Sequence, residues 1–75
     1  MNEFGSFVGC KVRILRDSTG YTSDLIGKVF TIVDEEFDTG DENIMNFTIV
    51  TGRPTNDPNL KNNEEIVSSL DVEIV

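Results

Sequence analysis

Six carboxylates lie close together in the middle of the chain, directly after the apolar run GKVFTIV at 27–33. They are Asp34, Glu35, Glu36, Asp38, Asp41 and Glu42. Clustered oxygen ligands suit hard cations such as Ca²⁺. A dense negative surface also suits a basic protein partner. The segment is therefore a candidate cation site, a candidate docking surface, or a solvated loop without a partner.

The calcium hypothesis can be tested against the spacing of known loops. A helix-flanked calcium loop requires glycine at its sixth position and a bidentate glutamate at its twelfth. Counted from Asp34, Gly40 is seventh and Met45 is twelfth, and the flanking residues have strand character. We therefore expect no dedicated metal site.

The triplet Asp38-Thr39-Gly40 has the residue types of the aspartic-protease signature, in which two such carboxylates share a proton and activate water. In that family the triplet follows an apolar strand and precedes a small residue. Here Phe37 precedes it and Asp41 follows it. Gly40 is therefore expected to form a turn and nothing more.

Catalytic residues are sparse in this chain. It contains no histidine, which is the commonest general base. Cys10 is the single cysteine, and without a histidine to act as its base it is expected to be an edge or core residue of a strand. We expect neither enzymatic activity nor a cofactor.

The net charge of -8 is distributed unevenly along the chain. Residues 34–75 contain eleven acids and two bases, whereas residues 1–33 contain three acids and four bases. The four bases, which could line one face of the first two strands, are Lys11, Arg13, Arg16 and Lys28. Nucleic acid is expected to bind poorly to so acidic a protein, because binding gains affinity when bases neutralise phosphates.

Length and composition predict one domain over residues 1–75. Phe4, Phe7 and Val8 precede the first strand, so residues 1–8 are expected to cap one end of the core or to form an apolar patch. A lone cysteine favours a reducing compartment, and the N-terminus lacks a basic start and a long apolar run. We expect a cytoplasmic protein with no membrane contact.

Alternating apolar and polar residues predict five short strands. They are 10–15, 27–33, 46–50, 64–67 and 71–75, with one helical turn at 68–70. The side chains predicted to face inward are Val12, Ile14, Phe47, Ile49, Leu70, Val72 and Ile74. Segment 27–33 is apolar on both faces, so it is predicted to be central or strongly bent. Loops are predicted at 16–26, 34–45 and 51–63, and the whole pattern indicates an all-β, closed antiparallel barrel or sandwich.

Three segments resemble Src-homology-3-like barrels, especially the KOW-type barrels of small bacterial and phage proteins. GCKVRILRDS is similar to their first strand, GKVFTIV to their second, and SSLDVEIV to their helical turn and closing strand. The resemblance implies a five-stranded Src-homology-3-like barrel, and its KOW character implies contact with nucleic acid. Phe30 stands where a KOW motif has its second glycine, and the absence of tryptophan argues against a polyproline ligand.

Together these features predict a non-enzymatic protein-interaction module, for which a small phage-encoded adaptor or inhibitor is one form. The predicted contact is the acidic loop, and the predicted partner is a host or viral protein with a basic surface. One alternative is a KOW-like nucleic-acid accessory module that uses the four bases named above. A second alternative is a DNA mimic, whose acidic surface occupies a nucleic-acid-binding protein.

Overall fold

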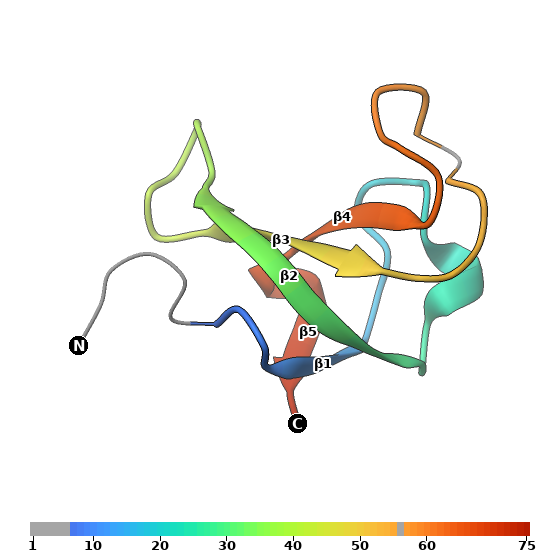
Figure 1. Cartoon of the computed structure of the whole chain (residues 1–75). Coiled ribbons are helices and arrows are strands. Elements are labelled where there is room, and N and C mark those ends of the chain that lie inside the picture. The colour runs from blue at the N-terminus through green and yellow to red at the C-terminus, as the bar shows by residue number, and fades with distance from the viewer. Residues whose placement is uncertain (1–6, 56) are drawn as a thin grey trace.

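The computed structural model describes residues 7–55 and 57–75, and within them the fold is all-β, as predicted. The strands are β1 (Lys11–Ile14), β2 (Val29–Phe37), β3 (Met45–Val50), β4 (Glu64–Ser68) and β5 (Val72–Ile74). Two short 3₁₀ turns, η1 (Ser23–Leu25) and η2 (Ser69–Asp71), complete the described elements. All strand pairs are antiparallel, in the order β4-β3-β2-β1-β5 (Figure 1).

Strand β2 holds the two halves of the sheet together. Its first residues pair with β1, and from Ile32 onward it pairs with β3. A register shift between Ile32 and Asp34 marks a β-bulge, which bends a strand and increases its twist. The strand expected at 27–33 is therefore both central and bent, which confirms the prediction.

The end of β2 corrects the predicted loop boundary. The acidic loop was expected to begin at residue 34, but Asp34, Glu35 and Glu36 pair with Thr48, Phe47 and Asn46 of β3. Backbone pairing overrides the poor strand propensity of acidic residues here, because alternate side chains of the strand face solvent. The connection between β2 and β3 is consequently limited to residues 38–44.

The core lies between the two halves of the folded sheet. Its buried members are Val12, Ile14, Leu25, Ile32, Phe47, Ile49 and Val67. The predicted inward positions of β1 and β3 are thus confirmed. Cys10 is partly buried and packs against this core, as expected for a residue at the start of a strand.

The sheet is open, which corrects the prediction of closure. β4 and β5 lie at opposite ends of the strand order, and within the described residues no ladder joins them. The η2 turn connects them instead, one residue later than the predicted 68–70, and Ser68 Oγ accepts a hydrogen bond from the Leu70 amide.

The inward alternation predicted at the C-terminus is wrong for two residues. Leu70 is 59% exposed and Ile74 is also exposed. The buried side chain in this segment is Asp71, whose carboxylate accepts hydrogen bonds from the amide and hydroxyl of Ser18. A 3₁₀ turn replaces the two-residue period of a strand at this point, so Leu70 turns outward.

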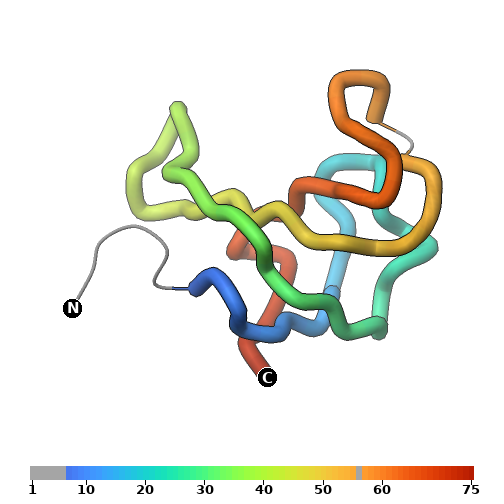
Figure 2. Tube along the Cα trace, in the orientation of Figure 1, coloured from blue at the N-terminus to red at the C-terminus, as the bar shows by residue number. Residues whose placement is uncertain are grey.

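Two long loops lie on one side of the molecule. Figure 2 shows residues 16–26, which include η1, beside residues 51–63. Contacts from Arg53 to Tyr21 and Asp24 hold the two loops together. In the part of the chain that the structure describes, no helix is long and apolar enough to cross a membrane.

Candidate docking surface

The predicted acidic residues do not share one environment. Asp34 and Glu36 are exposed on the outer face of β2, whereas Glu35 between them is only 7% exposed. Successive side chains of a strand point to opposite faces, which explains the difference. Glu35 was predicted as a docking residue, and its position on the core side corrects that assignment.

Glu35 instead joins the N-terminal segment to the sheet. Its Oε1 accepts a hydrogen bond of 2.7 Å from the Phe7 amide, and no group of the described chain donates to Oε2. Glu35 pairs with Phe47 across the sheet, and the rings of Phe7 and Phe47 lie 5.5 Å apart. Phe7 therefore packs against the core as a cap would, while Phe4 and the other residues before Phe7 lie outside the described chain.

Asp38 organises the connection between β2 and β3. Its carboxylate accepts hydrogen bonds from the Asn46 amide group at 3.2 Å, from the Gly40 N–H at 2.9 Å and from the Asp41 N–H at 3.1 Å. These bonds, led by that from Asn46, hold the pKa of Asp38 below its usual value. The Asp38-Thr39-Gly40 triplet thus forms a turn, as predicted, and Asp38 is a structural residue more than a docking residue.

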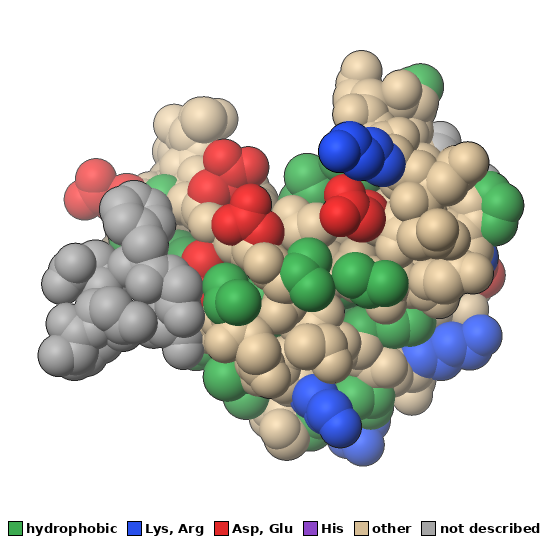
Figure 3. Space-filling model, viewed as in Figure 1, with side chains coloured by type: hydrophobic (Ala, Val, Ile, Leu, Met, Phe, Trp, Pro, Cys, Tyr) green, Lys and Arg blue, Asp and Glu red, His purple; other side chains and the backbone are tan. Residues whose placement is uncertain are grey.

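One of the remaining acids, Glu42, lines an open cleft. Asp41 and Glu42 are exposed in the 38–44 turn. The cleft has a volume of about 430 Å³ and is lined by Phe37, Glu42 and Asn43. Phe37 is 47% exposed at the end of β2. Figure 3 shows acidic side chains gathered over this end of β2 and the turn beyond it.

The predicted basic face is only partly available. Arg13 forms an ion pair of 2.9 Å with Glu73 of β5, and Arg16 donates a hydrogen bond to the Leu70 carbonyl. Lys11 and Lys28 are exposed, and in the described chain neither forms an ion pair. Two of the four bases are therefore engaged within the protein.

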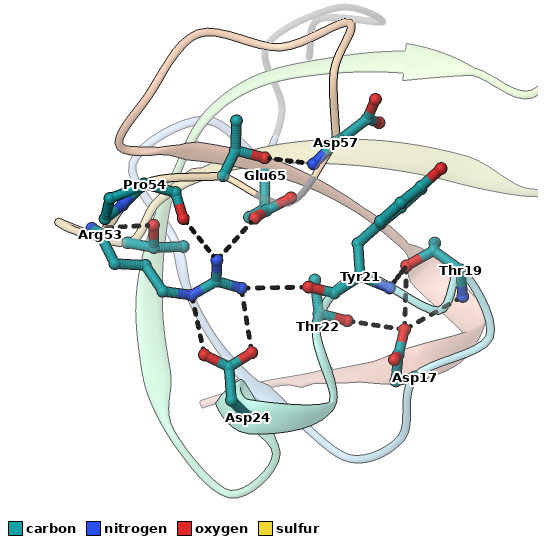
Figure 4. Close-up of polar contacts among 11 residues, drawn as sticks. Asp17, Thr19, Tyr21, Thr22, Asp24, Arg53, Pro54, Asp57 and Glu65 are labelled. Atoms are coloured by element: carbon teal, nitrogen blue, oxygen red, sulfur yellow. Dashed lines mark hydrogen bonds and ion pairs between the residues drawn. The ribbon is translucent and has the colours of Figure 1, made fainter.

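Sequence reasoning missed a buried ion pair centred on Arg53 (Figure 4). Its Nη1 lies 3.1 Å from Glu65 Oε2, and Glu65 is 1% exposed. Its Nε lies 2.9 Å from Asp24 Oδ2, and its Nη2 donates to Asp24 Oδ1 and to the Tyr21 carbonyl. The sequence feature that could have revealed this ion pair is Glu65 itself, because it is a charged residue that shares the inward face of its strand with Val67.

A second polar cluster shapes the 16–26 loop. Asp17 Oδ1 accepts hydrogen bonds from the hydroxyls of Thr19 and Thr22, both at 2.9 Å, and from the amides of Thr19 and Gly20. Burial by itself raises the pKa of Asp17, but these bonds, led by that from Thr22, outweigh burial and hold the pKa below its usual value. Both this cluster and the Arg53 pair fix loops in place.

Within residues 7–55 and 57–75, no three acidic or cysteine side chains are arranged to hold a metal ion. Comparison of the chain with protein-family models, curated proteins and solved structures gives no match. The candidate site with the clearest geometry is the cleft beside Phe37 together with the exposed acids around it.

Proposed function

We propose that this protein is a non-enzymatic interaction module that binds a basic surface of a partner protein. The contact is the acidic docking surface, which consists of Asp34, Glu36, Asp41 and Glu42. The observation that carries the proposal is an open cleft that is lined by Glu42 and the half-exposed ring of Phe37, with further exposed carboxylates on the same strand and turn.

The cleft suits a lysine or arginine side chain of the partner. The aliphatic stem of such a residue packs against an aromatic ring, and its cation gains from the ring face. Glu42 lies on the same cleft and supplies the opposite charge. The other exposed carboxylates of the docking surface contribute mainly to the association rate and to specificity, because exposed charge pairs add little affinity.

The fold is consistent with the role of a small adaptor or inhibitor. The strand order, with a 3₁₀ turn immediately before the last strand, supports the proposed Src-homology-3-like assignment. A phage-encoded protein acting on a host or viral protein in the cytoplasm is the form that we propose. Because the contact residues lie at a strand end and in a turn, they can vary without disturbing the core.

The test is affinity capture from nuclease-treated bacterial lysate with the wild-type protein and two variants. Glu42→Lys reverses a charge of the acidic docking surface, and Glu73→Lys makes the same change in net charge on β5. We expect Glu42→Lys to abolish capture of partners that the wild type and Glu73→Lys both retain. Equal loss in both variants would show that net charge alone governs binding and would contradict the proposal.

Two further outcomes separate the alternatives. Partners that disappear after nuclease treatment would indicate a nucleic-acid accessory role through the basic face. Partners that survive nuclease but are displaced by added DNA would indicate that this protein mimics DNA.

A further inference from the structure

The outer face of β2 carries exposed valines with no function in the docking proposal. Val29 and Val33 on β2 and Val50 on β3 are 42%, 43% and 47% exposed. In Figure 3 hydrophobic side chains occupy the middle of the face turned toward the viewer. Contiguous exposed apolar surface of this kind on a small domain often marks an interface.

The register places these valines on one face. Arg13 and Lys11 of β1 are exposed and pair with Val29 and Thr31, so these β2 residues also face outward. Val33 lies within the bulge, where Val33 and Asp34 together stand opposite Thr48. The bulge therefore adds an apolar side chain to the outer face at the middle of β2.

Charges of opposite sign flank this apolar centre. Lys11 of β1 lies beside Thr31, which is two residues before Val33 and stands between Val29 and Val33 along β2. Asp34 and Glu36 follow Val33 at the other end. Figure 3 shows acidic side chains above and to the left of the apolar middle and basic side chains below it, with a further basic group at the upper right. Around Val33 the outer face is thus basic on the side of Thr31 and acidic on the side of Glu36, and Val29 lies beyond the basic side.

We propose that this outer face forms a two-fold dimer with a second copy of the chain. A surface that is basic at one end and acidic at the other is complementary to itself after a half-turn, which is the requirement of an isologous interface. With the axis near Val33, Val33 packs against its symmetry mate. Glu36 of each copy then meets Lys11 of the other.

The size of the face and the charge of the protein set the conditions for dimer formation. A standard interface covers about 800 Å² on each partner, roughly a sixth of the 4685 Å² of this protein's surface. The net charge of -8 makes two copies repel at long range. At about 0.15 M salt the Debye length of about 8 Å screens this repulsion while leaving contacts across the interface largely intact.

This proposal does not rest on the docking function. The dimer would cover Asp34 and Glu36 of the acidic docking surface, whereas Asp41 and Glu42 lie in the turn beyond the outer face. Sedimentation equilibrium of the whole chain over a range of concentrations tests it. We expect a monomer–dimer equilibrium for the wild type and a monomer for Val33→Asp. Leu70→Asp, an equal change at an exposed residue on η2, is expected to dimerise as the wild type does.

A charge-swap experiment tests the orientation of the two copies. Glu36→Lys and Lys11→Glu each place like charges together twice in a symmetric dimer, so each is expected to raise the dissociation constant roughly ten-fold or more. A one-to-one mixture of the two variants restores both attractive pairs in a heterodimer with the total charge of the wild-type dimer. A monomeric wild type, or a mixture that associates no better than either variant, would overturn the proposal. Loss of lysate capture in Glu42→Lys would still report on docking separately.

Discussion

Several charged side chains of the described structure reach the surface. Replacing Arg53 by methionine should destabilise the protein more than replacing any other of them. The guanidinium faces the carboxylate of Glu65, which is 1% exposed, and Arg53 itself is only 21% exposed. Methionine retains most of the apolar stem but leaves Glu65 without its positive neighbour. A buried carboxylate in that position is costly because it has lost water without gaining a counter-charge.

The magnitude follows from the two halves of the cluster. Breaking a buried ion pair by removing one partner costs about 3–5 kcal/mol. The contact with Asp24, whose side chain is 54% exposed, adds no more than about 1 kcal/mol. A chain of 75 residues has a total stability of roughly 4–11 kcal/mol. Arg53→Met is therefore expected to remove about a quarter or more of it and to lower Tm by about 12 °C or more.

Urea and thermal unfolding followed by circular dichroism at pH 7 measure this loss. The matched control is Arg13→Met, because Arg13 and Glu73 form an ion pair whose side chains are 45% and 46% exposed. The control is expected to cost less than about 1 kcal/mol. A loss for Arg53→Met no larger than that of Arg13→Met would refute the inference that burial of Glu65 makes the pair essential.

A double variant separates loss of the pair from loss of packing. Arg53→Met with Glu65→Leu removes both charges and keeps apolar side chains of similar length. Replacement of a buried ion pair by apolar groups is often close to neutral, so most of the stability lost in Arg53→Met should return. Failure of the double variant to recover stability would show that the contacts of Arg53 with the Tyr21 and Pro54 carbonyls, rather than with Glu65, hold the loops together.

Two further predictions concern carboxylates with structural roles. Glu35→Gln should lower the free energy of unfolding by about 1–3 kcal/mol and speed hydrogen exchange at the Phe7 amide. The control Glu36→Gln, on the exposed side of the strand, should change neither quantity. Equal effects of the two variants would show that Glu35 does not hold the N-terminal segment. The pKa of Asp17 is lower in the folded protein, so its ionised form stabilises the fold above the ordinary aspartate pKa of about 3.9, and this contribution is lost as the pH falls through the folded value. Asp17→Asn should therefore be less stable than the wild type at pH 7, and urea titrations should show the difference shrinking below that pKa; a difference independent of pH would contradict the assignment.

Local patterns predicted most of the strands and their inward faces. Val12 and Ile14 alternate with Lys11 and Arg13, and this two-residue period determines which side of a strand is buried wherever one face meets solvent. The same reasoning identified Phe47 and Ile49. It failed at Leu70 because a 3₁₀ turn there has a different period, and the hydrogen bonds of Asp71 to Ser18 occupy the inward position.

The candidate site was predicted less well than the fold. The acids were identified correctly as a dense group, but composition cannot show which of them share a face. Pairing with β3 extends β2 through residues 34–37, buries Glu35 beside Phe47, and leaves Asp34 and Glu36 outside. Asp38 is removed from the docking group for another reason, since its oxygens hold the turn.

The sequence by itself determined an all-β chain with the core positions of its first and third strands, its acidic C-terminal half and its lack of histidine, because periodicity, charge and residue type are local properties. The tertiary structure alone decided that the sheet stays open, that Arg53 reaches Glu65 and Asp24, and that Phe37 lies beside Glu42 on a cleft. The first two of these features join residues far apart in the chain. Their formation depends on the bulge in β2 and on the packing of two loops, which no local pattern records.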